Sequence, residues 1–298
     1  MFERLYIEIS NICNLQCKFC PEVIREKKIL APSDFRKFAT QAKPLTKQIC
    51  LHLMGEPLAH PQFAEIMDIC DELGLKIFLT TNGTLLKRHS EKLLNWKSLE
   101  QINFSVHSYF ANPARLTLQD YLAPILDFCD KSLEKHEKKQ TDFYINLRLW
   151  NLAKSNQQKD QNLQVFDVLN RHFGIELNEN VDIKMNKSKK IQHKLYVHFD
   201  TEFIWPDLSQ MKRSEQGSCY GLRKQLAIHA NGDVVPCCLD KESLLKIGNV
   251  YENTLSEVMK SDRAKRIRTG FENGRLVEDL CQKCQYADRF RSQNTQTG

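Results

Sequence analysis

Three cysteines lie close together near the N-terminus, in the order Cys13, Cys17 and Cys20. Thiolates are soft ligands that bind iron–sulfur clusters and zinc. A four-iron cluster needs four ligands, and no fourth cysteine follows nearby. One iron would therefore remain open to a substrate or cofactor, so the spacing predicts a reactive metal centre.

The alternative is a zinc site that takes a distant cysteine or histidine as its fourth ligand. Zinc sites usually pair their ligands in Cys-x2-Cys modules. A spacing of three residues and then two, placed directly after an apolar strand, fits that arrangement poorly. The iron–sulfur interpretation is therefore favoured.

A second set of cysteines lies in the C-terminal quarter of the chain. Cys219 and Cys237 flank a predicted β-hairpin whose tight turn is Asn231-Gly232. After a helix that opens at the capping box Thr254–Glu257 and runs to about Arg268, the pair Cys281 and Cys284 supplies two more thiolates. The four cysteines predict a second metal site, for which a zinc ribbon remains the alternative.

Polar residues also follow several predicted strands. In Gly55-Glu56-Pro57, glycine permits close backbone approach and proline pushes Glu56 towards an extended conformation. A carboxylate presented in this way can accept charge-assisted hydrogen bonds from an ammonium group. The other polar residues at strand ends are Thr81, Asn82, Ser105, His107 and Arg148.

Alternating strands and helices must position these residues. We predict strands at Arg4–Ser10, Gln48–Met54, Lys76–Asn82, Gln101–Ser108, Asp142–Trp150 and Leu195–Phe203. We predict helices at Ser33–Gln41, Gln62–Leu73, Leu85–Asn95, Tyr121–Lys139 and Asn162–His172. This alternation predicts an α/β fold, a partial (β/α)6 barrel with its ligands at the C-terminal strand ends.

Composition narrows the functional class. The chain has 298 residues, of which 41% are hydrophobic and 27% charged, as in ordinary globular proteins. With neither a signal peptide nor a long apolar run expected, we predict a cytoplasmic protein without membrane association. In that compartment the eleven cysteines predict metal ligands and buried thiols, the latter at Cys50, Cys70 and Cys129.

Charge gives little support for a nucleic-acid partner. The net charge of +6 is mild, and the basic run Lys184–Lys194 is predicted to be a solvated loop. It lacks the interleaved aromatic residues that would stack on bases.

The first cysteine motif, with Phe19 just before its last cysteine, resembles the signature of the radical S-adenosylmethionine (SAM) superfamily. The resemblance implies a [4Fe–4S] cluster on Cys13, Cys17 and Cys20 that binds SAM through its open iron. Gly55-Glu56-Pro57 resembles the family's Gly-Gly-Glu-Pro motif, with Met54 in place of the first glycine, and implies that Glu56 binds the methionyl amine.

Three further positions match the family pattern. Thr81 and Asn82 are implied to lie beside the nucleoside, and Ser105 to face the ribose or carboxylate of SAM. Where many relatives continue with Leu-Asp, this chain has Val106-His107.

The C-terminal cysteines resemble the SPASM/twitch extension of radical SAM enzymes. The shorter twitch form fits better, because no cysteine follows Cys284. It implies one auxiliary [4Fe–4S] cluster on Cys219, Cys237, Cys281 and Cys284. Cys237 is favoured over Cys238 by its spacing from Gly232 and because neighbours on a strand face opposite ways. We expect a core domain at residues 1–210, an auxiliary domain at 211–290 and a disordered tail at 291–298.

The resemblance implies a radical SAM oxidoreductase that forms a 5′-deoxyadenosyl radical and removes hydrogen from a substrate. Small-molecule dehydrogenation is the leading hypothesis, with flavodoxin or ferredoxin as electron donor. Arg148 and His107 are the candidate catalytic residues. The alternative for Arg148 is a salt bridge at the barrel rim, and the alternative for His107 is the structural role that is more usual for a histidine at a strand end. The alternatives are a SPASM-type peptide-modifying maturase and a non-catalytic, metal-stabilised binding protein.

Overall fold

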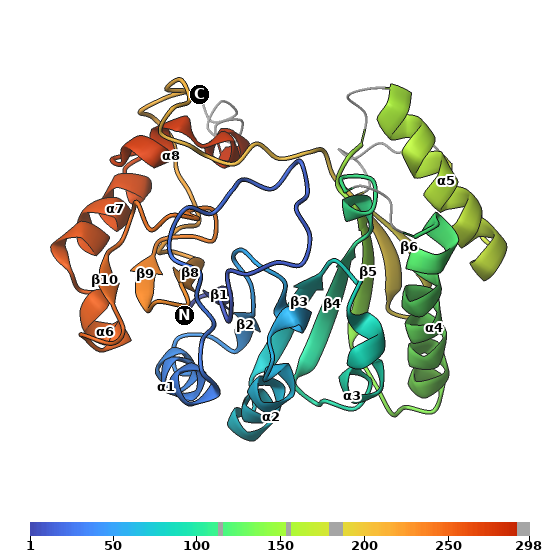
Figure 1. Ribbon diagram of the computed structural model, residues 1–298. Helices are drawn as coiled ribbons and strands as arrows, with labels where there is room; N and C mark the ends of the chain where they lie inside the picture. Colours follow the sequence, from blue (N-terminus) through green and yellow to red (C-terminus); the bar gives the residue numbers. More distant parts are fainter. Residues whose placement is uncertain (113–115, 153–155, 179–186, 291–298) are drawn as a thin grey trace.

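The computed structural model describes residues 1–112, 116–152, 156–178 and 187–290, and its strands form one ten-stranded sheet (Figure 1). Its barrel part consists of parallel neighbours: β1 (Arg4–Ile7), β2 (Gln48–Cys50), β3 (Lys76–Thr81), β4 (Leu99–Ser105), β5 (Tyr144–Leu149) and β7 (Leu195–Phe199). Their order along the sheet follows their order in the chain, as in successive βαβ units that all wind in one direction. The expected partial barrel is confirmed.

The connecting helices cover one face of this sheet (Figure 1). They are α1 (Pro32–Ala42), α2 (Phe63–Leu73), α3 (Ser90–Leu93), α4 (Leu118–Glu137) and α5 (Asn156–Phe173). Strand side chains alternate between two environments, so that Ile145, Leu147 and Leu149 of β5 are buried in the apolar core. Asn146 and Arg148 are on the other face, which is therefore the polar inner face of the barrel.

The predicted helix Leu85–Asn95 is not continuous. A 3₁₀ turn at Leu86–Arg88 precedes the short α3, and His89 between them has non-helical backbone angles. The His89 ring packs edge-on against Phe63 and lies 3.1 Å from the Leu58 carbonyl oxygen. These tertiary contacts explain the break.

The predicted strands are longer than the observed ones at their C-terminal ends. β2 ends at Cys50, and β4 gives way to a 3₁₀ turn at Val106–Ser108. The residues beyond the last paired position turn away from the sheet and form the loops that carry the polar motifs. The predicted strand ranges therefore extend into the first residues of these loops.

The C-terminal segment continues the same sheet. β8 (Gln225–Ile228) pairs in parallel with β1, and β9 (Asp233–Val235) and β10 (Gly248–Asn249) extend it further. Gly232 has a φ of +84° in the β8–β9 turn, where an added Cβ would lie 2.5 Å from the Tyr251 ring. The predicted hairpin is confirmed.

The helical part of this segment differs from the prediction. The capping box at Thr254 is present, but its helix α6 (Leu255–Val258) is short. Ser261 then caps a second helix, α7 (Asp262–Glu272), because its side chain accepts a hydrogen bond from the Ala264 N–H. α8 (Asp279–Lys283) follows and carries Cys281. In Figure 1, α6, α7 and α8 lie on the opposite side of the molecule from α4 and α5.

The basic run contains a strand where a loop was expected. β6 (Ser188–Gln192) pairs antiparallel with β7 at the edge of the sheet, and charged residues suit such an exposed edge. Residues 184–186 of this run and the predicted tail 291–298 lie outside the described residues. In the part of the chain that the structure describes, no helix combines the length and apolarity needed to cross a bilayer.

Candidate active site and auxiliary metal site

The three N-terminal cysteines lie on the loop that leaves β1. Cys17 is buried, whereas Cys13 and Cys20 are exposed. The Cys20 N–H donates to the Cys17 carbonyl oxygen at 2.9 Å, and the Asn112 amide donates to the Cys17 Sγ at 3.0 Å. The local fold thus brings the cysteines onto one compact loop.

The electrostatics of this loop suit a metal centre. A hydrogen bond from Cys20 lowers the pKa of Cys17 to about 7, against the effect of burial. Burial raises the pKa of Cys13, and the contact with Cys17 raises that of Cys20. Because three ionised thiols would repel one another, a positively charged iron–sulfur core would stabilise them. The donor set therefore fits the cluster that the sequence implies.

Glu56 is buried directly beside this loop. Gly55 precedes it with a φ of +79°, and an added Cβ would lie 2.3 Å from the Ser10 carbonyl oxygen, so only glycine fits. The Glu56 carboxylate accepts hydrogen bonds from the Thr81 hydroxyl and the Asn82 N–H, both at 2.7 Å. Burial raises the pKa of Glu56 in opposition to these bonds. Three residues predicted separately thus share one network.

Asn82 also links this network to the cysteine loop. Its side-chain Nδ2 donates to the side-chain Oδ1 of Asn14 at 2.9 Å and lies 3.9 Å from the Cys13 Sγ. Thr84 and the Tyr121 hydroxyl bond to the Asn82 side chain and carbonyl oxygen, respectively. Asn14, Thr84 and Tyr121 were missed because an amide or hydroxyl far away in sequence gives no motif.

His107 lies between the cysteine loop and β5. Its ring is 4.8 Å from that of Phe19, centroid to centroid. Its Nδ1 is 3.1 Å from the Arg148 carbonyl oxygen and 3.5 Å from the Trp150 backbone nitrogen. Burial lowers the pKa of His107 to about 4, so the imidazole is neutral at neutral pH.

Arg148 pairs in register with Ser105 and projects into the barrel. Its guanidinium stacks 4.4 Å from the Trp150 ring centroid, and Nη1 lies 3.4 Å from the Thr80 hydroxyl. Its buried Nε has no hydrogen-bond partner within the described ranges. No ion pair forms there either, so the rim salt bridge that we considered is not seen among those residues. Burial lowers the pKa of Arg148 to about 10, which leaves it protonated at neutral pH.

Two further residues, His198 and His52, belong to the inner face of the barrel. The Trp150 indole N–H donates to His198 Nδ1 at 2.9 Å, and His198 is the register partner of Arg148 on β7. His52, just beyond β2, packs edge-on against Tyr6 and has a buried Nδ1 without a partner among the described residues. An inward-facing polar residue on a predicted strand is the signal that would have identified them.

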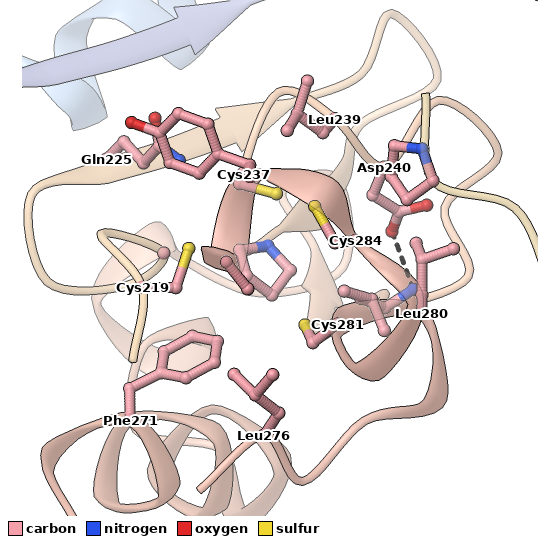
Figure 2. Close-up of a pocket in the computed structure, with 16 residues that line it drawn as sticks. Cys219, Gln225, Cys237, Leu239, Asp240, Phe271, Leu276, Leu280, Cys281 and Cys284 are labelled. Carbon is pink, nitrogen blue, oxygen red and sulfur yellow. Dashed lines mark hydrogen bonds between the residues drawn. The ribbon is translucent and has the colours of Figure 1, made fainter. Parts of the chain in front are cut away.

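The four C-terminal cysteines of the prediction line one pocket (Figure 2). Cys219 precedes β8, Cys237 follows β9, Cys281 is on α8 and Cys284 follows it. Figure 2 shows their sulfur atoms around a common space. The other lining residues include Pro206, Leu245, Phe271, Leu276 and Leu280.

This pocket fits a cluster held by cysteine alone. Burial raises the pKa of Cys237 well above its usual value, and the neighbouring thiols raise it further. A cationic core would relieve both effects. The only other carboxylate among the lining residues is that of Asp240, which already accepts the N–H groups of Leu244 and Leu245. No three His, Cys, Asp or Glu side chains of the described residues converge closely enough to hold a single metal ion.

Two family models match the chain. The radical SAM superfamily model matches residues 7–148, and the SPASM iron–sulfur cluster-binding domain matches residues 219–285. The first match covers the cysteine loop and continues to Arg148. The second begins at Cys219 and includes Cys284.

Two curated relatives match parts of the chain or match it at low identity. A probable GTP 3′,8-cyclase from Methanothermobacter marburgensis is 32% identical over 123 residues, which cover 40% of each chain. The subtilosin biosynthesis protein AlbA of Bacillus subtilis is 22% identical over 278 residues, which cover 85% of this chain and 58% of AlbA. The chain thus spans about 40% to 58% of the length of these relatives.

Solved structures share the fold. BtrN, in complex with AdoMet and 2-DOIA, aligns with a TM-score of 0.53 at 16% identity and covers 96% of this chain and 93% of BtrN. Streptococcus suis SuiB, bound to its precursor peptide SuiA, aligns with a TM-score of 0.61 at 19% identity. That alignment covers 96% of this chain and 72% of SuiB.

Proposed function

Because the chain belongs to the radical SAM superfamily and carries a C-terminal SPASM domain, we propose that it oxidises its substrate after hydrogen abstraction. When bound, the first cluster supplies an electron that splits SAM into methionine and a 5′-deoxyadenosyl radical, and an auxiliary cluster supplies an acceptor for a second electron. The observation that carries the proposal is the placement of the cysteine loop beside the buried Glu56 network.

The protein's own residues bind and orient SAM in this proposal. Cys13, Cys17 and Cys20 would hold the first cluster. Gly55 and Pro57 fix the turn that presents Glu56, whose carboxylate binds the methionyl ammonium. Thr81 and Asn82 keep that carboxylate in place.

Residues on the inner face of the barrel bind the carboxylate and accept the proton in this proposal. Ser105 and Arg148 bind a carboxylate, that of SAM or of the substrate, since the Arg148 guanidinium is charged and its Nε is without a partner among the described residues. Arg148 is a poor base because it stays protonated. His107 is the better proton acceptor, because its imidazole is neutral at neutral pH. Phe19 positions the His107 ring by direct contact.

We further propose that Cys219, Cys237, Cys281 and Cys284 hold one auxiliary [4Fe–4S] cluster. Residues 1–210 would form the SAM-binding domain and 211–290 the auxiliary domain. The net reaction would be a two-electron oxidation of a small molecule in the cytoplasm, with ferredoxin or flavodoxin as electron donor. The similarity to BtrN along nearly the whole of both chains supports this choice.

A second candidate is modification of a peptide. The AlbA match over 85% of this chain and the fold similarity to peptide-bound SuiB favour it. The two candidates share the same cofactors and differ only in what enters the barrel.

The test is SAM cleavage by the anaerobically reconstituted protein. We expect dithionite-reduced enzyme to produce 5′-deoxyadenosine, and Cys20→Ser to produce none. Incubation with deuterated small-molecule or peptide pools, followed by mass spectrometry of the 5′-deoxyadenosine, identifies the class of hydrogen donor. A wild-type protein that binds iron but neither binds nor cleaves SAM would refute the proposal.

A further inference from the structure

Glu8 joins three segments that are far apart in the sequence. It follows β1 directly and is completely buried. One carboxylate oxygen accepts hydrogen bonds from Arg25 Nη2 at 2.6 Å and from the Met54 N–H at 3.3 Å, and the other accepts from the Ala230 N–H at 3.2 Å. Glu8 therefore contacts the end of the cysteine loop, the turn before Gly55-Glu56, and the C-terminal hairpin.

A second set of contacts extends from Glu8 to the auxiliary pocket. The fully buried His229 places Nδ1 at 3.7 Å from the Glu8 carboxylate. Its Nε2 donates to the Asp240 carbonyl oxygen at 2.9 Å, and Asp240 lines the pocket of Figure 2. These contacts lead from the wall of the auxiliary pocket to the turn that presents Glu56, and their one step without a hydrogen bond among the described residues is the 3.7 Å approach of His229 Nδ1 to Glu8.

The same two regions are joined at the surface. The Glu242 carboxylate accepts the N–H groups of Ile24 and Arg25, each at 3.0 Å. The Lys241 ammonium donates to the Glu22 carbonyl oxygen at 2.9 Å. The segment after Cys20 is therefore bonded to the residues that follow the auxiliary cysteines.

We propose that Glu8 is a positioning residue that couples the auxiliary pocket to the SAM-binding turn, so that each site responds to occupancy of the other. The inference rests on the proposed function. A buried carboxylate that loses one hydrogen-bond partner is strongly destabilised, because water cannot replace that partner. A displacement of His229 or Arg25 should therefore move Glu8, and with it the Met54 backbone N–H that Glu8 binds. Because coupling between binding sites is reciprocal, SAM binding must also act on the auxiliary pocket.

The first measurement is hydrogen exchange of the anaerobic holoenzyme with and without SAM. We expect SAM to slow exchange both at Gly55–Leu58 and at the remote amides of Leu244 and Leu245, which bond to the Asp240 carboxylate. Glu8→Gln should retain the local protection and lose the remote protection. Remote protection that is absent from the wild-type enzyme, or that persists in Glu8→Gln, would overturn the inference.

The second measurement is a double-mutant cycle on the dissociation constant of SAM. We expect Glu8→Gln and His229→Phe each to weaken binding by about threefold to thirtyfold, and the double variant to be no weaker than Glu8→Gln alone. Additive effects, or a Glu8→Gln variant that binds like wild type, would contradict the coupling. If Glu8→Gln does not fold, His229→Phe breaks the connection from the other side and undergoes the same exchange measurement.

Tyr251→Phe is the matched control. It removes a different contact between the N-terminal and C-terminal parts, the 3.1 Å hydrogen bond from the Tyr251 hydroxyl to Asp34, and should leave SAM binding unchanged. A wild-type holoenzyme that does not bind SAM would instead refute the proposed function, so the two failures are distinguishable.

Discussion

Cys237 and Cys238 are adjacent in sequence but face different parts of the molecule. Cys237 lines the auxiliary pocket together with three other cysteines. Cys238 packs against Leu53 and Val235, and its thiol bonds to the side chain of Tyr6 on β1. The strand end thus separates a candidate ligand from a buried thiol of the barrel.

This separation predicts different outcomes for two otherwise equal substitutions. Cys237→Ser should lose the auxiliary cluster, because it removes one of four ligands. Cys238→Ser should keep it. Iron and sulfide content per chain, with Mössbauer spectra of the anaerobic protein, measures the difference; equal cluster loss in both variants would contradict the assignment of Cys237.

Gly55→Ala should abolish SAM binding. Its added Cβ would meet the Ser10 carbonyl oxygen at 2.3 Å, so the turn that presents Glu56 must move. Gly74→Ala is the matched control, because Gly74 has a similar φ of +63° but open space around it. We expect the control to cost about 1 kcal/mol of stability and to bind SAM normally. Equal SAM affinities in the two variants would show that the close approach at Gly55 has no role in binding.

Glu56→Gln should weaken SAM binding about tenfold or more. The substitution keeps the shape of the side chain but removes the negative charge that faces the methionyl ammonium, a loss of about 1.5 to 3 kcal/mol. Equilibrium titration monitored by the spectrum of the reduced cluster gives the affinity. Thr81→Ser, which retains the hydroxyl that donates to Glu56, should stay close to wild type.

Glu8 should make the stability of the protein depend on pH in the acid range. Burial opposes its ionisation, but His229 and Arg25 outweigh burial and lower the pKa of Glu8 to about 2. A depressed pKa means that the carboxylate stabilises the fold above its unfolded-state pKa of about 4.5, and that this contribution falls as pH drops towards about 2. The contribution is about 3 kcal/mol at neutral pH.

Urea unfolding of metal-free wild type and Glu8→Gln measures this contribution. The difference in the free energy of unfolding should be constant between pH 7 and pH 5 and should narrow below about pH 4.5. A difference that is independent of pH would mean that Glu8 acts by packing alone.

The sequence was sufficient for the barrel and for the cysteine pattern because both depend on local periodicity and spacing. Alternating apolar residues locate β1 to β5, and three cysteines on one short loop need no tertiary information. The helix predicted at Leu85–Asn95 was wrong because contacts of His89 with residues distant in sequence decide its backbone.

The remainder of the site could not be predicted, because its partners meet only in the folded chain. Asn112 reaches Cys17 from 95 residues away, and Glu8 meets Ala230 across 222 residues. Neither Asn112 nor Glu8 belongs to a sequence motif that would have identified it. His107 and Arg148 were identified as polar groups, but their proton states depend on burial, which spacing does not reveal.

The parallel pairing of β1 with β8 has a consequence for synthesis of the protein. Leu5 lies beside Leu226, so one edge of the first strand is covered by a segment that leaves the ribosome long after it. Until then the nascent barrel presents an open apolar strand edge, a template for aggregation. Chains interrupted before residue 225 should therefore depend on chaperones and accumulate as insoluble material.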